Sequence, residues 1–367
     1  MLERRNELIL LVAWVLLLAA AWPAASVPGQ EKPVAAAPNS AAPAGLQKIA
    51  DDIYVRVVSP DGEEVANSGV VILGSGVLLF DSHFTPEAGA DLEELIKGVT
   101  AQPVRYIVNS HFHADHTHGN QAFGTARQII GSTLARRDML QKDAPALNRM
   151  QAIAQKQVEQ LARELSLESN PGKQEALRLQ LKTHQAFMRR LASLRILVPS
   201  LTLDDSLTII DGERELNLLY LGAGHTEGDI VLYLPREKVA FLGDLFFNDA
   251  LPNVEDASPL EWMDTLREVL KLDAATFVPG HGRIGTRQDV EEFLGYLEDL
   301  KALVAPAVKR GESLEQVVND SRLPAKYDGF GFQNFFPANL QKMYAELKAA
   351  QPAAAPRGGA KKKEARP

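Results

Sequence analysis

A cluster of metal-binding residue types lies in the stretch NSHFHADHTHGN, which runs from residue 109 to residue 120. Four of the eight histidines of the chain fall within this stretch, together with one aspartate. Zinc in proteins is bound by imidazole nitrogens and carboxylate oxygens, and a catalytic zinc ion needs at least three protein ligands. In the order HxHxDH, His111 and His113 can face one side of a loop while Asp115 and His116 face the other. The spacing therefore predicts ligands for two neighbouring metal ions.

Three further donors are predicted at strand ends later in the chain. The segment LGAGHTEGD presents His225, VAFLGDLFF presents Asp244 and TFVPGHG presents His281. Each donor follows an apolar or β-branched run and stands beside a glycine, which allows the backbone to turn tightly. Five histidines and two aspartates therefore form the candidate set of metal ligands: His111, His113, Asp115, His116, His225, Asp244 and His281.

Predicted strands and helices alternate in the segments that would carry these donors. Residues 52–59 and 69–82 have the alternating or continuous apolar pattern of strands, and residues 86–99 have the proline start and apolar period of a helix. Residues 103–110 predict a buried strand directly before the cluster, and α/β proteins usually build their sites at such strand ends. Later strands are predicted at 206–224, 229–235, 238–244 and 275–279, and later helices at 258–272, 289–309 and 339–349. The pattern predicts a layered α/β fold.

A helical insertion is predicted between the two strand-rich blocks, over residues 132–198. Apolar residues recur at helical spacing in two arms, which are separated by the turn sequence SNPGK. This pattern predicts an αα-hairpin. A structural extension, a dimer contact and a cap over the active site are all compatible with the sequence, so a homodimer stays open.

The two ends of the chain differ from its middle. Residues 1–26 carry an arginine pair, an apolar run of fifteen residues and then small residues, which predicts a secretory signal peptide. An uncleaved membrane anchor is the alternative, but a bilayer span needs about 20 apolar residues. Residues 27–45 form a Pro/Ala-rich linker, and residues 351–367 predict a disordered basic tail. The folded domain is therefore expected over residues 46–350.

Composition narrows the class of protein. The chain of 367 residues is 46% hydrophobic, so it can bury a sizeable core. It has no cysteine, and its stability after export must come from that core, from bound metal or from both. Its net charge of −8 disfavours a nucleic-acid partner. We expect a periplasmic or secreted protein that acts on a small molecule, without membrane attachment once the signal is cleaved.

The four motifs HxHxDH, GHT, GD and PGHG occur in the order found in metallo-β-lactamase-fold hydrolases, which the chain resembles over residues 51–303. The resemblance implies a four-layer αββα metallo-β-lactamase sandwich into which the αα-hairpin is inserted. It also implies two Zn²⁺ ions per chain and divides the seven ligands between them. His111, His113 and His225 would bind the first ion, Asp115, His116 and His281 would bind the second, and Asp244 would bridge the two.

The resemblance further implies a dizinc hydrolase that attacks a carbonyl with a metal-bridging hydroxide, and the predicted signal peptide implies that it is exported. Zinc lowers the pKa of bound water from 15.7 to about 7. Asp115 is the implied catalytic residue, which would orient the nucleophile and pass its proton to the leaving group. Asp81 and Thr226 are implied partners of the ligands. Among the histidines outside the motifs, His118 and His83 are expected near the site and His184 in the helical insertion.

Asp244 bears on the substrate. Zinc β-lactamases characteristically have cysteine or serine near this place, whereas a bridging aspartate resembles glyoxalase II, lactonases and hydrolases associated with quinoprotein systems. The chain thus resembles the glyoxalase II-like, quinoprotein-associated type, and we expect it to cleave an ester, thioester or lactone. A zinc-dependent β-lactamase is the alternative activity, and a non-catalytic metal-binding module is the alternative of another class.

Overall fold

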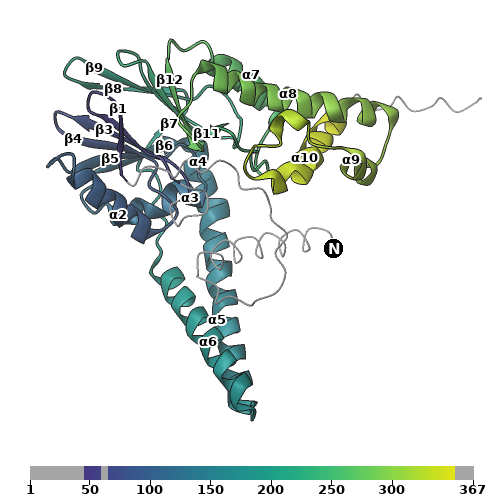
Figure 1. The fold of residues 1–367 in the computed structure, drawn as a ribbon. Coiled ribbons are helices and arrows are strands. Elements are labelled where there is room, and N and C mark those ends of the chain that lie inside the picture. The colour runs from purple at the N-terminus through teal and green to yellow at the C-terminus, as the bar shows by residue number, and fades with distance from the viewer. Residues whose placement is uncertain (1–44, 59–64, 352–367) are drawn as a thin grey trace, which may run out of the picture.

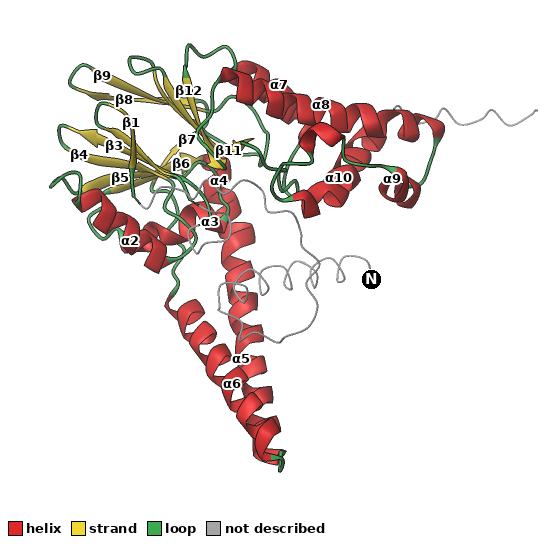
Figure 2. Cartoon of the chain, in the orientation of Figure 1, coloured by secondary structure: helices red, strands yellow, loops and turns green. Residues whose placement is uncertain are grey.

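A computed structural model of the chain describes residues 45–58 and 65–351. Within these residues two β-sheets pack face to face, and helices cover both outer faces (Figures 1 and 2). This arrangement confirms the predicted α/β class and the αββα sandwich. The predicted signal peptide, all of the linker but its last residue, and the tail beyond residue 351 lie outside the described residues. Among the described helices, none has both the length and the apolar character that a membrane crossing requires.

The first sheet contains seven of the described strands, which lie side by side in chain order. Strands β1 to β4 pair antiparallel, whereas β4 to β7 pair parallel. Parallel strands place their carboxyl ends at one edge, so the segments that follow β4, β5 and β6 meet there. The strands are β1 (Gln47–Ala50), β2 (Ile53–Arg56), β3 (Ser68–Leu73), β4 (Gly76–Phe80), β5 (Val104–Val108), β6 (Gln128–Ser132) and β7 (Leu201–Leu203).

Helix α2 (Pro86–Lys97) covers the outer face of the first sheet. The side chain of Thr85 caps its start by accepting the backbone N–H of Ala88, and a proline occupies the first turn. Leu92 and Ile96 are buried against the strands. Burial of one such side chain contributes about 1.5–3 kcal/mol. The apolar face of α2 therefore anchors this helix on the first sheet, beside the sheet edge at which the loops with the candidate ligands meet.

The second sheet contains five of the described strands in the order β12-β11-β10-β9-β8. Only β11 and β12 are parallel. Helices α7 (Pro259–Val269) and α8 (Arg287–Arg310) cover its outer face, so β11 is buried along its whole length. The strands are β8 (Ser206–Asp211), β9 (Arg214–Leu219), β10 (Val231–Leu234), β11 (Val239–Phe247) and β12 (Thr276–His281).

The core between the sheets follows from the alternation of side chains along the strands. In β9, Leu216 and Leu218 are buried whereas Glu215 is exposed, as a period of two requires. Phe241 from β11 meets Phe80 from β4 at a ring-centroid distance of 5.6 Å. The two sheets are thus fixed face to face by apolar contacts next to the edge that carries the candidate ligands.

The predicted αα-hairpin is confirmed as α5 (Ala144–Leu167) and α6 (Pro171–Ser193). It is inserted between β6 and β7, which are neighbours in the first sheet, and it is preceded by α4 (Thr133–Asp138) and the π-helical turn η2 (Met139–Asp143). The hairpin runs away from both sheets, so only its base lies beside the body of the protein (Figure 1). Whether this extension contacts a second copy of the chain stays a prediction.

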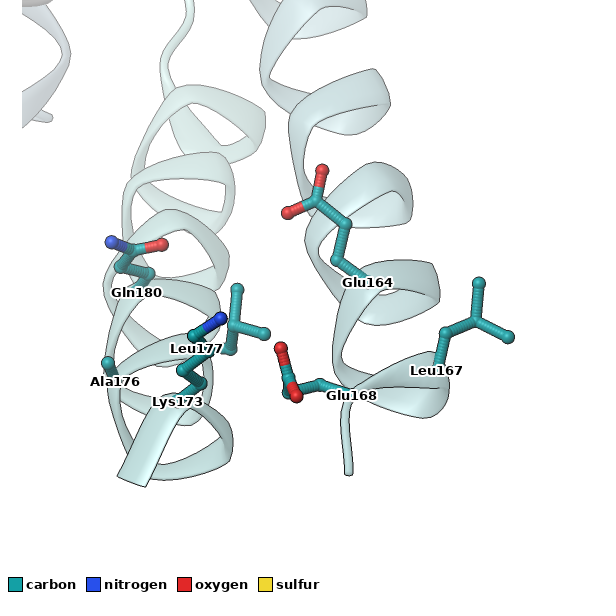
Figure 3. Close-up of a pocket in the computed structure, with 7 residues that line it drawn as sticks. All are labelled: Glu164, Leu167, Glu168, Lys173, Ala176, Leu177 and Gln180. Atoms are coloured by element: carbon teal, nitrogen blue, oxygen red, sulfur yellow. The ribbon is translucent and has the colours of Figure 1, made fainter. Parts of the chain in front are cut away.

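A hollow of about 500 Å³ lies between the far ends of α5 and α6. Figure 3 shows Glu164 and Glu168 on one side of it and Lys173 on the other, with Leu177 between them. The hollow is separated from the sheets by the length of the hairpin (Figure 2). Its lining contains no histidine, so it is unrelated to the candidate metal ligands.

The C-terminal segment packs beside α8. Helix α10 (Phe336–Ala349) begins three residues before the predicted start and buries Leu340 and Met343 against α8. Helix α9 (Leu314–Asp320) and the 3₁₀ turns η3 (Ala325–Tyr327) and η4 (Gln333–Phe335) precede it. Strands β1, β6 and β7 and helix α9 are not predicted from the sequence. These elements are short, and their conformation depends on pairing and packing with neighbours more than on local propensity.

Candidate metal centre

The predicted ligands come from four segments of the two sheets. His111 lies three residues beyond the end of β5. The histidine-rich segment, predicted as a loop, continues into the short helix α3 (Ala114–Thr117) and the 3₁₀ turn η1 (His118–Ala122). His225 lies in the turn between β9 and β10, and His281 is the last residue of β12. The fold thus brings segments distant in the chain to one place.

The fourth segment is β11, and here the sequence prediction is wrong. The pattern predicts Asp244 at the end of a strand, but β11 continues to Phe247. The register of β11 against β12 shifts on both sides of Gly243, which has a φ of 53°. Glycine adopts this left-handed conformation at little cost. The irregularity allows a strand buried along its whole length to present a carboxylate to the histidines.

The candidate ligands form two groups. In each group, the potential ligand atoms of all members lie within 4.8 Å of one another. The first group contains His111, His113, His225 and Asp244, and the second contains Asp115, His116 and His281. Nε2 of His225 lies 2.9 Å from Nδ1 of His113. All seven predicted residues are therefore brought together, in the two groups that the resemblance implied, with Asp244 in the first.

Four buried atoms of the candidate ligands form no hydrogen bond within the described protein: Nε2 of His111, Nε2 of His116, Nδ1 of His225 and Oδ1 of Asp244. A buried polar atom left unpaired costs about 1–3 kcal/mol. Imidazole nitrogens and carboxylate oxygens with free lone pairs are zinc ligands. The donor set therefore fits a divalent cation, and a bound cation would remove this cost.

Asp81 and Ser110 orient two of the ligands. Asp81 lies in the loop after β4 and is buried, with a φ of 60°. Its carboxylate accepts the backbone N–H and the hydroxyl of Ser110, and Oδ2 lies 2.8 Å from Nδ1 of His116. The hydroxyl of Ser110 lies 2.9 Å from Nδ1 of His111. Both rings are thereby held with Nε2 toward the centre, so the implied contact between Asp81 and a ligand is present.

Two further contacts orient His113 and His281. Nε2 of His113 lies 3.1 Å from Oδ2 of Asp256, so its Nδ1 faces the centre. Lys142, on the π-helical turn at the base of the hairpin, donates to the other carboxylate oxygen of Asp256 at 2.9 Å. Nδ1 of His281 lies 3.1 Å from the carbonyl oxygen of Val65. The sequence analysis missed these partners, because nothing in the local sequence distinguishes them from other surface or loop residues.

Burial and the neighbouring carboxylates set opposite pKa shifts in the centre. Burial lowers the pKa of His225 to about 3. Burial also acts to lower the pKa of His281, but the charges of Asp244 and Asp115 outweigh it and raise this pKa to about 9. A cation must displace a proton held by such a ring, so metal binding here is coupled to proton release.

Thr226, the other implied partner, acts on the turn rather than on a ligand. Its backbone N–H and its hydroxyl both donate to the buried carboxylate of Asp229, at 2.8 Å each. Its hydroxyl also accepts the backbone N–H of Gly228. Burial raises the pKa of Asp229 to about 7. These bonds fix the turn that carries His225.

The histidines outside the motifs have other partners. His118 is buried and its Nε2 lies 3.1 Å from a carboxylate oxygen of Asp143, at the base of the hairpin. His83 is also buried, and its Nδ1 lies 2.8 Å from the carbonyl oxygen of Ala66. His184 lies on α6, as predicted. None of the three belongs to the two ligand groups found in the described residues.

Gly280 allows close contact between β12 and Asp244. A Cβ atom at Gly280 would lie 1.9 Å from Oδ1 of Asp244, so we expect Gly280→Ala to displace the carboxylate. Metal content and activity should fall at least about tenfold, the lower range for loss of a contact that positions a ligand. Elemental analysis and thermal unfolding measure the effect.

Gly295→Ala is the matched control for this substitution. Gly295 lies within α8, and a Cβ atom there would meet no described atom within 4 Å outside its own stretch of helix. Alanine is favoured over glycine in a helix by about 0.8–1.0 kcal/mol, so this variant should keep its metal and unfold at the same or a higher temperature. A Gly280→Ala protein with the metal content of the wild type would contradict the prediction.

A family model described as the Metallo-beta-lactamase superfamily matches residues 61–281. The match spans well over half of the chain and includes all seven candidate ligands. A solved structure, a metallo-beta-lactamase from Pontibacter korlensis, superposes with a TM-score of 0.51 and 20% identity, over 69% of this chain and 98% of that chain. This likeness supports the fold.

The matches to two curated relatives cover smaller shares of those relatives' own lengths. A metallo-beta-lactamase type 2 of Bacteroides fragilis is 35% identical over 26% of this chain and 40% of its own length. A linear primary-alkylsulfatase of a Pseudomonas species is 23% identical over 70% of this chain and 49% of its own length. The matched segments thus span less than half of these relatives. From the family match and the fold, the chain belongs to the metallo-beta-lactamase superfamily.

Proposed function

We propose that this protein is an exported dizinc hydrolase that cleaves an ester, thioester or lactone bond. The observation that carries the proposal is the position of the Asp244 carboxylate. Its Oδ2 lies 3.2 Å from Nε2 of His225 in the first group and 3.3 Å from Nε2 of His281 in the second. Its Oδ1 lies 3.2 Å from Nε2 of His116. One carboxylate within reach of both groups suits a pair of ions that share a ligand.

When bound, zinc polarises a substrate carbonyl and lowers the pKa of water from 15.7 to about 7, which supplies hydroxide at neutral pH. Asp115 is the residue that we propose moves the proton. Its Oδ2 lies 3.3 Å from Nε2 of His281, and its side chain is 23% exposed, the largest exposed fraction among the seven candidate ligands. A carboxylate at the solvent side of the centre can accept a proton from the nucleophile and donate it to the leaving group.

The substrate class rests on Asp244 and on the resemblance to glyoxalase II-like proteins, which stays a prediction. An alkoxide or thiolate leaves more readily than an amide nitrogen, which favours esters, thioesters and lactones as substrates. The name of the alkylsulfatase relative adds sulfate esters to the compounds worth testing.

A zinc-dependent β-lactamase is the second candidate, because a relative at 35% identity bears that name. Export would place either enzyme where it meets small molecules outside the cytoplasm. A non-catalytic metal-binding module is the candidate of another class. The complete ligand set argues against it, together with the exposed carboxylate of Asp115, because a module that only stores metal needs no open acid–base group.

A substrate panel tests the proposal. Zinc-loaded protein is assayed with esters, thioesters, lactones, sulfate esters and β-lactams, and the expected best substrate is an ester, thioester or lactone with a kcat/KM well above that of any β-lactam. A β-lactam hydrolysed in the range of about 10⁴ to 10⁸ M⁻¹s⁻¹, with slow esters and lactones, would establish the second candidate instead. A folded, metal-loaded protein inactive on the whole panel would favour the binding module.

A further inference from the structure

The segment that leads into α10 is attached to the strand that carries Asp244. Gly331 forms a parallel bridge with Ala250, just beyond the end of β11. The backbone N–H of Leu251 donates to the carbonyl oxygen of Gly331 at 3.0 Å. The backbone N–H of Gly331 donates to the carbonyl oxygen of Asp249 at 2.8 Å. The residue that follows this bridge is therefore held in place relative to the metal centre.

That residue, Phe332, has a left-handed backbone, with φ 56° and ψ 31°. This conformation costs a residue with a Cβ atom about 1–2 kcal/mol, and a bulky aromatic residue adopts it rarely. Strained residues cluster at sites where the position of a side chain matters for function. The strain at Phe332 therefore suggests that its ring is placed for more than packing.

The ring of Phe332 stands edge-on to the candidate ligand His281. The ring centroids are 5.9 Å apart and the planes meet at 83°. The buried ring of Phe247 stacks on the same imidazole at 5.1 Å and 19°. Phe332, in contrast, is only partly buried, and Phe335 lies beside it at a ring-centroid distance of 5.8 Å. Phe332 and Phe335 thus place partly exposed aromatic surface next to a ligand of the second group.

The centre itself is most exposed at Asp115, whose carboxylate lies 3.3 Å from the imidazole of His281. A substrate that binds beside Asp115 is therefore separated from the ring of Phe332 only by the side chain of His281. We propose that Phe332 is a specificity-determining residue, whose ring contacts the apolar acyl chain of an ester bound with its carbonyl at the metal centre. The inference rests on the proposed ester hydrolase function. It predicts a preference for medium-length over short acyl chains.

The test compares p-nitrophenyl acetate, butyrate, hexanoate and octanoate as substrates of the full-length, zinc-loaded protein. In the wild type, kcat/KM is expected to rise from acetate to hexanoate. Phe332→Gly removes the ring and, because glycine accepts a positive φ, relaxes the backbone without refolding it. The preference for hexanoate over acetate should fall at least about tenfold, since a methylene contact in an apolar site is worth a factor of about 10 or more.

Two measurements separate this role from a structural one. In Phe332→Gly, zinc content should stay within about twofold of the wild type, and the loss of kcat/KM should grow with acyl chain length from acetate to hexanoate, because the metal ligands are unchanged and only the contact with the acyl chain is removed. Phe330→Ala is the matched control, since Phe330 belongs to the same segment but packs on Tyr327 at 5.1 Å. This control should keep the chain-length preference even if it lowers the unfolding temperature.

The remaining outcomes distinguish two failures. An unchanged preference in Phe332→Gly, or a loss shared equally by all four esters together with loss of zinc, would overturn the role of Phe332 alone. A flat chain-length profile in the wild type would do the same. A wild-type protein that hydrolyses none of the esters would overturn the proposed function, and this inference with it.

Discussion

Replacing Asp244 with alanine should lower metal content and hydrolytic activity together, with a loss of more than about 100-fold in kcat/KM. Loss of residues that merely orient a ligand costs about 10- to 100-fold. Asp244 contributes more, because its carboxylate reaches His225 and His281 at 3.2 and 3.3 Å and so serves both groups. Its removal also leaves buried imidazoles facing each other without a compensating negative charge.

The Asp244 variants are assessed by elemental analysis and by steady-state kinetics on the best substrate of the panel. Asp244→Asn keeps the shape of the side chain and removes the charge, so it separates the two contributions. Asp264→Ala is the control, because Asp264 is an exposed residue of α7 that pairs only with Arg267 among the ion pairs described. Full activity with two metal equivalents in Asp244→Ala would exclude the bridging role.

Purified protein should contain about two zinc equivalents per chain, and their removal should abolish activity and lower the unfolding temperature. The ligands extend from His111 to His281 along the chain, so only the folded state assembles them. A ligand present at about 100 times its Kd stabilises the folded state by about 2.7 kcal/mol. For a domain of this size, that corresponds to a decrease of roughly 4 °C for each ion removed.

Thermal unfolding is measured before chelation, after it and after zinc is added back. The metal-free protein should unfold at the lower temperature and recover both its stability and its activity with zinc. Recovery distinguishes reversible loss of metal from irreversible damage. Protein isolated without metal, protein with a single iron-type centre, or an unfolding temperature insensitive to chelation would contradict the prediction.

Most strands and helices of the sandwich could be predicted because their patterns are local. A period of two in β9 and the proline start of α2 are properties of consecutive residues. The candidate ligands could also be named, because each stands in a short motif and the motifs occur in a fixed order. Short elements such as β7, with three residues, carry too little local pattern to be predicted.

The tertiary structure alone decided how the ligands are oriented. Asp256 lies 143 positions from His113, and Val65 lies 216 positions from His281. These partners meet only because the two sheets pack face to face, and no local pattern records such contacts. The same holds for Asp244, which lies inside β11 because α7 and α8 bury that strand beyond its predicted end. The sequence by itself determined which side chains can bind metal, since ligand chemistry belongs to residue types. Packing decided which of their atoms face the centre, because orientation depends on neighbours that are distant in the chain.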